Sequence, residues 1–432
     1  MKLRLTFLLI LAAITTHAQL SPQERKIIDY VNRNLPAAEQ LLIQTVNINS
    51  GTLNKEGVRR TGDIFRKEFD KIGFTTEWVN LPDSLNRAGH LVAVRKGANG
   101  KKRLLLIGHL DTVFELDMKF SPYTRLNDST ATGQGANDMK GGDVIMIAAL
   151  QALNATGSLK DASIIAYLTG DEEKPGLPYS VARADFIAKA KISDISLGFE
   201  GAQGLNTVAT ARRGSSSWTL GVTAKTGHSS GVFGRGSGYG AIYEAARVVN
   251  SFREELSAEK YLTFNPGMFI GGTEIKKDAA LVRGETVSKT NIIAPEALVT
   301  GDLRFITEAQ KEAARAKMSA IAAQNLNGTK SSLTFSDGYP AMSPTAGNNR
   351  LVTVLDKISR DMGIGATNAG DPGSRGAGDI SFVAQYTDCL DGLGASGGGS
   401  HNPGETINLK QFPYLVQRAA LLIYRLSLED KE

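Results

Sequence analysis

The sequence is poor in the two residue types that most often hold zinc ions in small protein modules. It contains one cysteine, Cys389, and five histidines among its 432 residues. A single thiol excludes both Cys-rich zinc modules and a disulfide framework within the chain. The fold must therefore be held by packing, or by metal ions with other ligands. The histidines are few enough to consider individually: His17, His90, His109, His228 and His401.

Charge of one sign is not concentrated anywhere in the chain. Lys and Arg number 49 against 44 Asp and Glu, which gives a formal charge of +5 without basic runs. This balance lacks the basic stripe of a nucleic-acid-binding surface, so we expect no nucleic-acid partner. With 41% hydrophobic and 22% charged residues, the chain has ample material for a buried core.

Long apolar runs are also scarce. In residues 1–18, Lys2 and Arg4 precede an apolar stretch, and small residues close the segment before Gln19. This pattern predicts a secretory signal peptide, with a buried N-terminal helix as the alternative. The stretch is too short to span a bilayer comfortably. We therefore expect a periplasmic or secreted protein with no membrane anchor after cleavage, and His17 is lost with the leader.

From Leu20 onward, strand-like apolar runs alternate with helical patterns. Strands are predicted at 90–94, 103–109, 162–170 and 195–199, and a helix at 141–157. Continuous apolar strands between amphipathic helices indicate an α/β fold, with a mostly parallel sheet covered by helices on both faces. Functional groups in such sheets lie at the carboxyl ends of the strands.

The pattern changes near residue 214. Residues 214–329 resemble a compact α+β unit: a strand, a helix, two strands and a long helix, with alternating strands that have one wet face. We interpret this unit as a domain inserted into a first domain made of residues 19–213 and 330–432. After the insertion, the segment LTFSDGYPAM and the later helices and strand are expected to rejoin the parallel sheet.

His109 and Asp111 lie in GHLDTV, directly after the apolar run RLLLI. A neutral imidazole is a good zinc ligand, and a carboxylate two residues later can take its other N–H. A capped turn with an incidental histidine is the alternative.

Four further acidic residues follow predicted strands or begin a helix. Asp138 lies in GQGANDMKGGD, Glu172 and Glu173 in TGDEEKPG, and Glu200 in LGFEGA. Consecutive acids at the end of a buried strand are costly unless a cation or a proton neutralises them. A common helix entry explains Asp138 equally well, and a solvated acidic turn remains an alternative for the glutamates.

The remaining histidines carry weak signals alone. His401 lies in GGGSHNPGETINL and His228 in KTGHSSG, and both loops would ordinarily be solvated. His90 has no motif around it, so we interpret it as structural.

The joint order of these motifs is more specific than any one of them. The strings GHLDTV, GANDMKGG, TGDEE, FEGA and SHNPGE occur in sequence, and RRGSSSWTLGVTAKTGHSS marks the start of the insertion. Together they resemble the M20 family of metallopeptidases, most closely its glutamate carboxypeptidase branch. The resemblance covers essentially the whole chain after the leader, and it implies a zinc-exopeptidase fold with an inserted lid domain.

The resemblance implies a site with two Zn²⁺ ions, and Co²⁺ or Mn²⁺ suits the same ligands. In it, Asp138 bridges the ions, His109 and Glu200 complete one, and Glu173 and His401 complete the other. Glu172 matches the general base that moves the proton of the attacking water.

Other matches concern a residue that orients a metal ligand and several residues of the lid. Asp111 matches the carboxylate that orients His109. His228 matches a lid histidine that stabilises the oxyanion, supplied in dimeric members by the partner subunit, so the resemblance leaves open a monomer and a homodimer formed through the lid. Asn291 and Arg304 match lid positions that bind the substrate's terminal carboxylate, although strand arginines are more often surface residues. Arg213 and Arg375 are further candidates for binding the substrate's terminal carboxylate. The resemblance also implies that the peptide bond between Asp138 and Met139 is cis.

The sequence therefore predicts an exported di-zinc exopeptidase. Its expected substrates are small peptides or N-acyl amino acids, from which it would release a C-terminal amino acid. Two alternatives stay open: a di-zinc aminopeptidase or dipeptidase, and an exported binding protein that has lost catalysis on the same fold.

Overall fold

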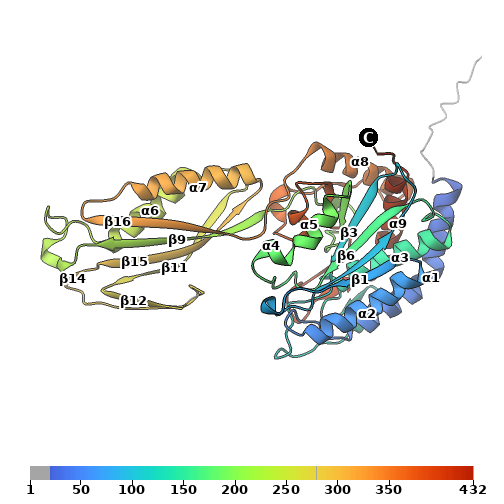
Figure 1. Ribbon diagram of the computed structural model, residues 1–432, viewed down its shortest axis with the longest axis horizontal. Coiled ribbons are helices and arrows are strands. Elements are labelled where there is room, and N and C mark those ends of the chain that lie inside the picture. Colours follow the sequence, from blue (N-terminus) through green and yellow to red (C-terminus); the bar gives the residue numbers. More distant parts are fainter. Residues whose placement is uncertain (1–19, 279, 432) are drawn as a thin grey trace, which may run out of the picture.

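The computed structural model describes residues 20–278 and 280–431, which form two lobes joined by a narrow connection (Figure 1). The predicted leader, residues 1–18, lies outside the described residues. The larger lobe consists of residues 20–213 and 338–431, and the smaller lobe of residues 214–337. Within the described part of the chain, no helix has the length and apolarity needed to cross a membrane.

A six-stranded sheet forms the centre of the larger lobe, in the order β1-β2-β6-β3-β7-β18. β6, β3, β7 and β18 are parallel to one another, whereas β1 and β2 are antiparallel at one edge. The prediction of a mainly parallel sheet is confirmed. The strands are β1 (Thr75–Val79), β2 (His90–Arg95), β3 (Arg103–His109), β6 (Ser163–Thr169), β7 (Ile195–Gly198) and β18 (Asp388–Leu390).

Helices cover both faces of this sheet because its strands are apolar on both sides. Leu104 and Leu106 of β3 pack into one core cluster, and Leu105 and Ile107 pack into another on the opposite face. The first cluster is covered by α1 (Pro22–Val46), α2 (Lys55–Lys71), α3 (Lys140–Ala155), α8 (Ala346–Asp361) and α9 (Phe412–Ser427). The short helices α4 (Tyr179–Ala182) and α5 (Ala184–Ala190) lie over the other face.

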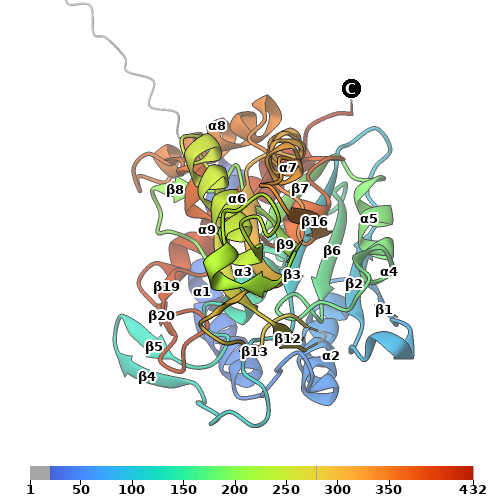
Figure 2. The ribbon, with the colours of Figure 1, turned by 90° about the vertical axis from the view of Figure 1, so that its left-hand side faces the viewer.

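Shorter elements surround the central sheet. A small sheet in the order β19-β20-β5-β4 lies on the side of the larger lobe away from β1 and β2 (Figure 2). Its strands are β4 (Thr124–Asn127), β5 (Thr130–Thr132), β19 (Gly397–Gly398) and β20 (Thr406–Asn408), and a parallel pair joins β8 (Thr207–Val208) to β17 (Asn368–Ala369). The 3₁₀ turns are η1 (Asp83–Leu85), η2 (Ser229–Gly231), η3 (Pro372–Ser374) and η4 (Asp379–Phe382).

The smaller lobe is an antiparallel sheet in the order β11-β15-β9-β16. Two helices, α6 (Ala241–Leu256) and α7 (Glu308–Ala323), cover one of its faces and form a separate core with it (Figure 1). The strands are β9 (Gly214–Ala224), β11 (Thr263–Gly272), β15 (Glu296–Phe305) and β16 (Thr329–Asp337). A hairpin of β12 (Glu274–Lys277) and β13 (Gly284–Val287) adjoins it, and β10 (Gly227–His228) pairs with β14 (Ile292–Ile293) at the far end.

The predicted end of the insertion at residue 329 is wrong by one strand. β16 pairs with β9 from Thr329↔Ala224 to Asp337↔Ser216, so LTFSD belongs to the smaller lobe and does not rejoin the parallel sheet. Half-buried and exposed side chains alternate along β16 as far as Ser336, as expected of an edge strand with one wet face. The chain then returns to the larger lobe, where α8 and β18 join the parallel sheet as expected.

The two chain crossings between the lobes are bonded to each other. Arg212 and Met342 exchange main-chain hydrogen bonds of 2.9 and 3.0 Å, and the Ser215 N–H donates to the Tyr339 carbonyl oxygen over 2.8 Å. The connection is therefore a two-stranded ribbon, and we call residues 212–215 and 338–342 the hinge.

Candidate active site

Three adjacent strands of the central sheet end at one place. β3 ends at His109, Glu172 and Glu173 follow β6, and Glu200 follows β7. Because β6, β3 and β7 are parallel neighbours, their carboxyl ends share one edge of the sheet. The sheet therefore gathers these four side chains at the edge where α/β proteins usually bind ligands.

Asp138 lies between the two histidines of the cluster. One of its oxygens is 3.4 Å from His109 Nε2, and the other is 3.2 Å from His401 Nε2. His109 Nε2 also lies 3.7 Å from a Glu200 oxygen, and His401 Nε2 lies 3.3 Å from a Glu173 oxygen. Asp138 thus presents one oxygen to each of two separate groups, an arrangement suited to bridging two cations.

Three overlapping groups of potential ligand atoms result, each with its atoms within 4.8 Å of one another. They are His109, Asp138 and Glu200; Asp138, Glu173 and His401; and His109, Glu172 and Glu173. The first two are the sets implied by the sequence resemblance. Glu172 belongs to neither of these two sets, although it lies beside both of them.

Unpaired polar atoms within the cluster fit bound cations. His109 Nε2 and Glu173 Oε1 are buried and have no hydrogen-bond partner among the described residues. A buried polar atom without a partner costs free energy, and imidazole nitrogens with carboxylate oxygens are the donor set that divalent transition metals prefer. The residues present therefore fit a metal centre.

The electrostatics of the cluster indicate the same need for positive charge. Burial raises the pKa of Glu172 well above its usual range, and the charges of Glu200 and Glu173 add to this while His109 opposes it. Burial also raises the pKa of Glu200 to about 7, although Arg212 opposes the shift. Carboxylates packed this closely need protons or cations between them.

Asp111 organises the cluster through several contacts. Its carboxylate accepts hydrogen bonds from the main-chain N–H groups of Glu172 and Glu173, over 3.0 and 3.1 Å, and from the Thr52 hydroxyl over 2.6 Å. His109 Nδ1 lies 3.1 Å from the Asp111 carbonyl oxygen and 3.4 Å from the carboxylate. Asp111 therefore fixes both the histidine and the turn that carries the two glutamates.

Glu405 is a residue of the site that the sequence reasoning missed. Its buried carboxylate accepts hydrogen bonds from the main-chain N–H groups of Gly135, Asn137 and Asp138, over 3.1, 2.6 and 2.9 Å. It thus holds the turn that presents Asp138. Glu405 closes the string SHNPGE, so the motif contained it, but nothing in the sequence assigned it a role. The Asp138–Met139 peptide is cis, as expected.

Two other residues of the site were also missed. Asp143 in α3 is fully buried, and neither of its carboxylate oxygens has a hydrogen-bond partner in the described part of the chain. Burial raises its pKa well above the usual range. Arg212, in the hinge, donates to Asp391 over 2.6 Å and lies 3.9 Å from a Glu200 oxygen. Both are ionisable groups that only the fold brings to the site.

A cavity of about 440 Å³ opens onto the cluster. Its lining includes the proposed ligands Asp138, Glu173 and His401, and two arginines, Arg212 and Arg375. This volume accommodates a small organic substrate next to the potential metal ligands.

The structure does not bring the predicted lid residues to this cavity. His228 and Asn291 lie at the far end of the smaller lobe, beside β10 and β14 (Figure 1). They are separated from the hinge by β9, whose 11 residues span about 35 Å at the usual rise of a strand. Arg304 lies near the hinge end of β15 and pairs with Asp302 over 2.9 Å.

The two remaining candidates from the sequence have definite places. Arg213, in the hinge, contacts the Thr263 hydroxyl over 3.4 Å and does not line the cavity. His90 is buried between the Gly170 N–H, which donates to Nδ1 over 3.2 Å, and the Ala182 carbonyl oxygen, 3.0 Å from Nε2. His90 has structural partners, as the sequence indicated.

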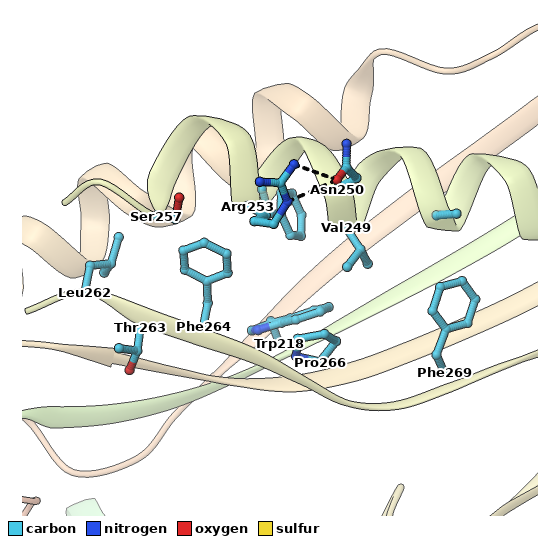
Figure 3. A pocket seen from close by; sticks show the side chains of 12 residues that line it. Trp218, Val249, Asn250, Arg253, Ser257, Leu262, Thr263, Phe264, Pro266 and Phe269 are labelled. Atoms are coloured by element: carbon cyan, nitrogen blue, oxygen red, sulfur yellow. Dashed lines mark hydrogen bonds between the residues drawn. The ribbon is translucent and has the colours of Figure 1, made fainter.

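A second cavity, of about 560 Å³, lies in the smaller lobe between α6 and the edge strand β11 (Figure 3). Val249, Phe264 and Phe269 face it, and none of its lining residues is an acid, a histidine or a cysteine. This groove therefore offers an apolar surface and no groups for the chemistry of the acidic cluster.

Comparison with known proteins places this architecture among metallopeptidases. A model of peptidase family M20/M25/M40 matches residues 105–425. Carboxypeptidase G2 of Pseudomonas sp. (strain RS-16) is 26% identical over 397 residues, which cover 91% of this chain and 90% of that protein.

Solved structures share the fold. Aminopeptidase PepT of Bacillus cereus superposes with a TM-score of 0.70 at 17% identity, covering 90% of this chain and 98% of that one. The YXEP protein of Bacillus subtilis, described as a dinuclear metal-binding peptidase of the M20 family, gives 0.63 at 12% identity, covering 92% and 99%. The chain belongs to peptidase family M20/M25/M40, and it is a metal-dependent peptidase or amidohydrolase.

Proposed function

We propose that this protein is an exopeptidase that hydrolyses the amide bond of a C-terminal amino acid in small peptides or N-acyl amino acids. One observation carries the proposal: Asp138 faces two separate ligand sets, and Glu172 lies beside both without belonging to either. A spare carboxylate next to a two-cation site has the position that a general base requires. The similarity to carboxypeptidase G2 along most of both chains favours the C-terminal direction of cleavage.

In this proposal, His109, Asp138 and Glu200 hold one divalent ion, and Asp138, Glu173 and His401 hold the other. The mixed imidazole and carboxylate set suits Zn²⁺, and Co²⁺ or Mn²⁺ would also be accepted. When bound, the ions would acidify a water molecule and polarise the scissile carbonyl group.

The protein's own groups would move the protons. The Glu172 carboxylate accepts a proton from the attacking water and passes it to the nitrogen of the departing amine. Asp111 keeps this carboxylate in place through its hydrogen bond to the Glu172 N–H. Replacing the carboxylate by an amide removes the base and leaves the shape of the site intact.

The test uses the metal-loaded protein and a small panel of N-acyl amino acids and free-amine dipeptides. We expect hydrolysis of the N-blocked substrates, loss of activity with a chelator, and a fall of at least about 100-fold in kcat for Glu172→Gln. Cleavage restricted to free-amine substrates would identify an aminopeptidase instead. Activity retained in Glu172→Gln would contradict the mechanism, and no hydrolysis of any substrate would favour a binding protein.

We also propose that the protein acts as a homodimer formed through the smaller lobe. His228 lies far from the acidic cluster of its own chain, at the opposite end of β9 (Figure 1). The groove between α6 and the edge strand β11 is apolar, and Ile242, Tyr243 and Phe269 are 44%, 56% and 43% exposed. Exposed apolar side chains gathered at a sheet edge favour a second copy as the occupant.

Such a dimer would let each smaller lobe serve the site of the other subunit. His228 would stabilise the oxyanion there. Asn291 would travel with it, because its carbonyl oxygen accepts the Ser229 N–H over 2.9 Å, and would contact the substrate's carboxylate. Arg304, close to the hinge, would contribute to the same recognition within its own chain after lobe closure.

Complementation tests this arrangement. His228→Ala and Glu172→Gln are each expected to be inactive alone, and equilibrated mixtures should recover up to about a quarter of wild-type activity. Half of randomly mixed dimers are mixed, and each of these has one intact site. A monomer in sedimentation, or no recovery on mixing, would contradict the proposal.

We propose further that the enzyme is exported. The support is the sequence of residues 1–18, with Lys2 and Arg4 before an apolar stretch. N-terminal sequencing of the protein recovered outside the cytoplasm should begin at Gln19, and a retained leader would contradict export by this route.

A further inference from the structure

Arg375 lies in the active-site cavity on a loop that the larger lobe supplies. It follows η3, and its Nη1 donates to the Gly201 carbonyl oxygen over 2.8 Å. Gly201 directly follows the proposed ligand Glu200. The guanidinium is therefore bonded to the residue that follows a member of the acidic cluster, in the wall of the cavity that opens onto this cluster.

The loop that carries Arg375 is fixed by the hinge. The Arg213 N–H donates to the Arg375 carbonyl oxygen over 3.2 Å, and Arg212 Nε donates to the Gly376 carbonyl oxygen over 2.8 Å. The Arg212 side chain also packs so closely on Gly378 that a Cβ there would collide with its guanidinium. Both sides of Arg375 are thus held in place, which lowers the entropy cost of using its side chain for binding.

Most of the hydrogen-bonding capacity of Arg375 is unused. A guanidinium has five N–H donors, and in the described part of the chain only the bond to Gly201 engages this one. No carboxylate within the described residues forms an ion pair with it, and at the neighbouring Gly376 a Cβ would meet nothing within 4 Å. Because Arg375 itself lines the cavity, its unused donors are available to a ligand bound there.

The charge of the cavity also leaves Arg375 uncompensated. Two arginines, Arg212 and Arg375, line the cavity. Arg212 already forms an ion pair with Asp391 over 2.6 Å. The four carboxylates of the cluster, from Asp138, Glu172, Glu173 and Glu200, balance the charge of two divalent ions. A negative group of the substrate would meet no competing anion at Arg375.

We propose that Arg375 anchors a carboxylate of the substrate, a role that rests on the proposed exopeptidase function and that the larger lobe supplies from the wall of the cavity itself. A planar guanidinium can hold a carboxylate through two parallel hydrogen bonds, which fixes its orientation as well as its position. The substrates are then N-acyl amino acids whose carboxylate lies on the released amino acid, either its α-carboxylate or an acidic side chain.

Three probes separate these two sources of the carboxylate. N-benzoylglutamate carries both groups, N-benzoylglutamine carries the α-carboxylate alone, and N-benzoylisoglutamine carries the side-chain carboxylate alone. Hydrolysis of each is measured with the wild-type holoenzyme, Arg375→Gln and Arg375→Lys, with Arg60→Gln as the control. Arg60 is an exposed residue of α2, so its replacement makes the same charge change outside the cavity.

We expect Arg375→Gln to lose about 10- to 100-fold in kcat/KM, mainly through KM, for the probes that carry the recognised carboxylate. Arg375→Lys should recover only part of this loss because it cannot form the paired bonds. For the probe that lacks the recognised carboxylate, kcat/KM should change little in Arg375→Gln. The identity of this probe therefore shows which carboxylate Arg375 binds. An equal loss on all three probes, or no loss on any, would overturn the proposal.

A binding measurement keeps this inference separate from the proposed function. The metal-loaded Glu172→Gln variant is titrated with the same probes by calorimetry, with and without Arg375→Gln. If no probe is hydrolysed but binding still depends on Arg375, the exopeptidase proposal fails and the anion site stands. If probes are hydrolysed while neither KM nor affinity depends on Arg375, the anion site is refuted and the exopeptidase proposal stands.

Discussion

The hydroxyl group of Tyr339, a hinge residue, donates a hydrogen bond to the main-chain carbonyl oxygen of Glu172 over 2.8 Å. Tyr339 is buried, and its ring packs against Tyr179 and Phe382. The hinge ribbon is therefore bonded directly to the residue proposed as the general base. A second hinge residue, Arg212, lies near Glu200. The hinge therefore contacts the active site at two residues, Glu172 and Glu200.

Removing that hydroxyl should slow the reaction without weakening substrate binding. In Tyr339→Phe the ring packing persists, but the Glu172 carbonyl oxygen loses its partner and the base is less firmly positioned. We expect a fall of about 5- to 10-fold in kcat, the effect of one neutral hydrogen bond, with KM unchanged. Steady-state kinetics on an N-acyl amino acid measures both constants. Tyr414→Phe, an exposed position on α9, is the matched control and should behave as wild type.

Glu405 should matter for both stability and metal affinity. In the wild-type protein both carboxylate oxygens of Glu405 accept main-chain N–H groups of the Asp138 turn. In Glu405→Gln one of these oxygens becomes an amide nitrogen, which cannot accept a hydrogen bond, so at least one N–H group loses its acceptor. We expect the free energy of unfolding to fall by about 1–3 kcal/mol. Metal affinity should also fall, by about 10- to 100-fold, as for other residues that hold a ligand in place. Denaturant unfolding and competition with a chelator measure the two effects. Glu285→Gln, on an exposed strand of the smaller lobe, serves as the control, and wild-type affinity in Glu405→Gln would refute the role.

The number of bound ions should depend on His401 but not on His228. Elemental analysis of dialysed wild-type protein should give two divalent ions per chain, and His401→Ala should lose one of them. Because ions that bind only the folded state stabilise it, wild-type Tm should rise with added metal and fall with a chelator. His228→Ala replaces another exposed histidine, at the far end of the smaller lobe, and should keep both ions. One ion or none in the wild-type protein would contradict the two-ion site.

A carboxylate far from the active site should make stability depend on pH. Burial raises the pKa of Glu24, but hydrogen bonds from the Ser21 N–H and from Arg425, each 2.7 Å, and from the Ser21 hydroxyl bring it below the usual range. A carboxyl group with a lowered folded-state pKa stabilises the protein above its unfolded pKa, about 4.3. That stability is lost as the pH falls through the folded pKa.

The measurement compares thermal unfolding of wild type and Glu24→Gln between pH 7 and pH 3. Glutamine keeps the helix cap but not the charge, so the gap in Tm should be constant at neutral pH and should narrow below about pH 4.3. Asp29→Asn removes an exposed charge from the same helix and corrects for net charge. A gap that stays constant to pH 3 would contradict the assignment.

The sequence predicted those parts of the molecule whose signal is contiguous. The run RLLLIGH is apolar without alternation, and it forms β3, buried on both faces and ending at His109. In β3 the local pattern and the final position agree. The strings around Asp138 and Glu173 identified potential ligands only jointly, through their resemblance to the M20 family, because each motif alone is equally explained by a helix entry or a solvated turn.

Contacts between distant segments could not be predicted in this way. Glu405 reaches back more than 260 residues along the chain to the N–H groups before α3, and no local pattern distinguishes it from a surface glutamate. Tyr339 meets Glu172 only because the hinge passes over the end of β6. The alternation in β16 was visible in its sequence, but its partner β9 was not.

The order in which the chain is made has a consequence for the larger lobe. Its first segment supplies His109, Asp138, Glu173 and Glu200, whereas His401 and Glu405 come from the C-terminal end. The whole smaller lobe emerges from the ribosome between them, and its strands and helices, which are local in sequence, can form during that interval. A chain that has not reached this segment therefore lacks both a proposed ligand, His401, and the carboxylate that secures the Asp138 turn. The proposed metal site can therefore be assembled only once the segment that carries His401 and Glu405 has been made.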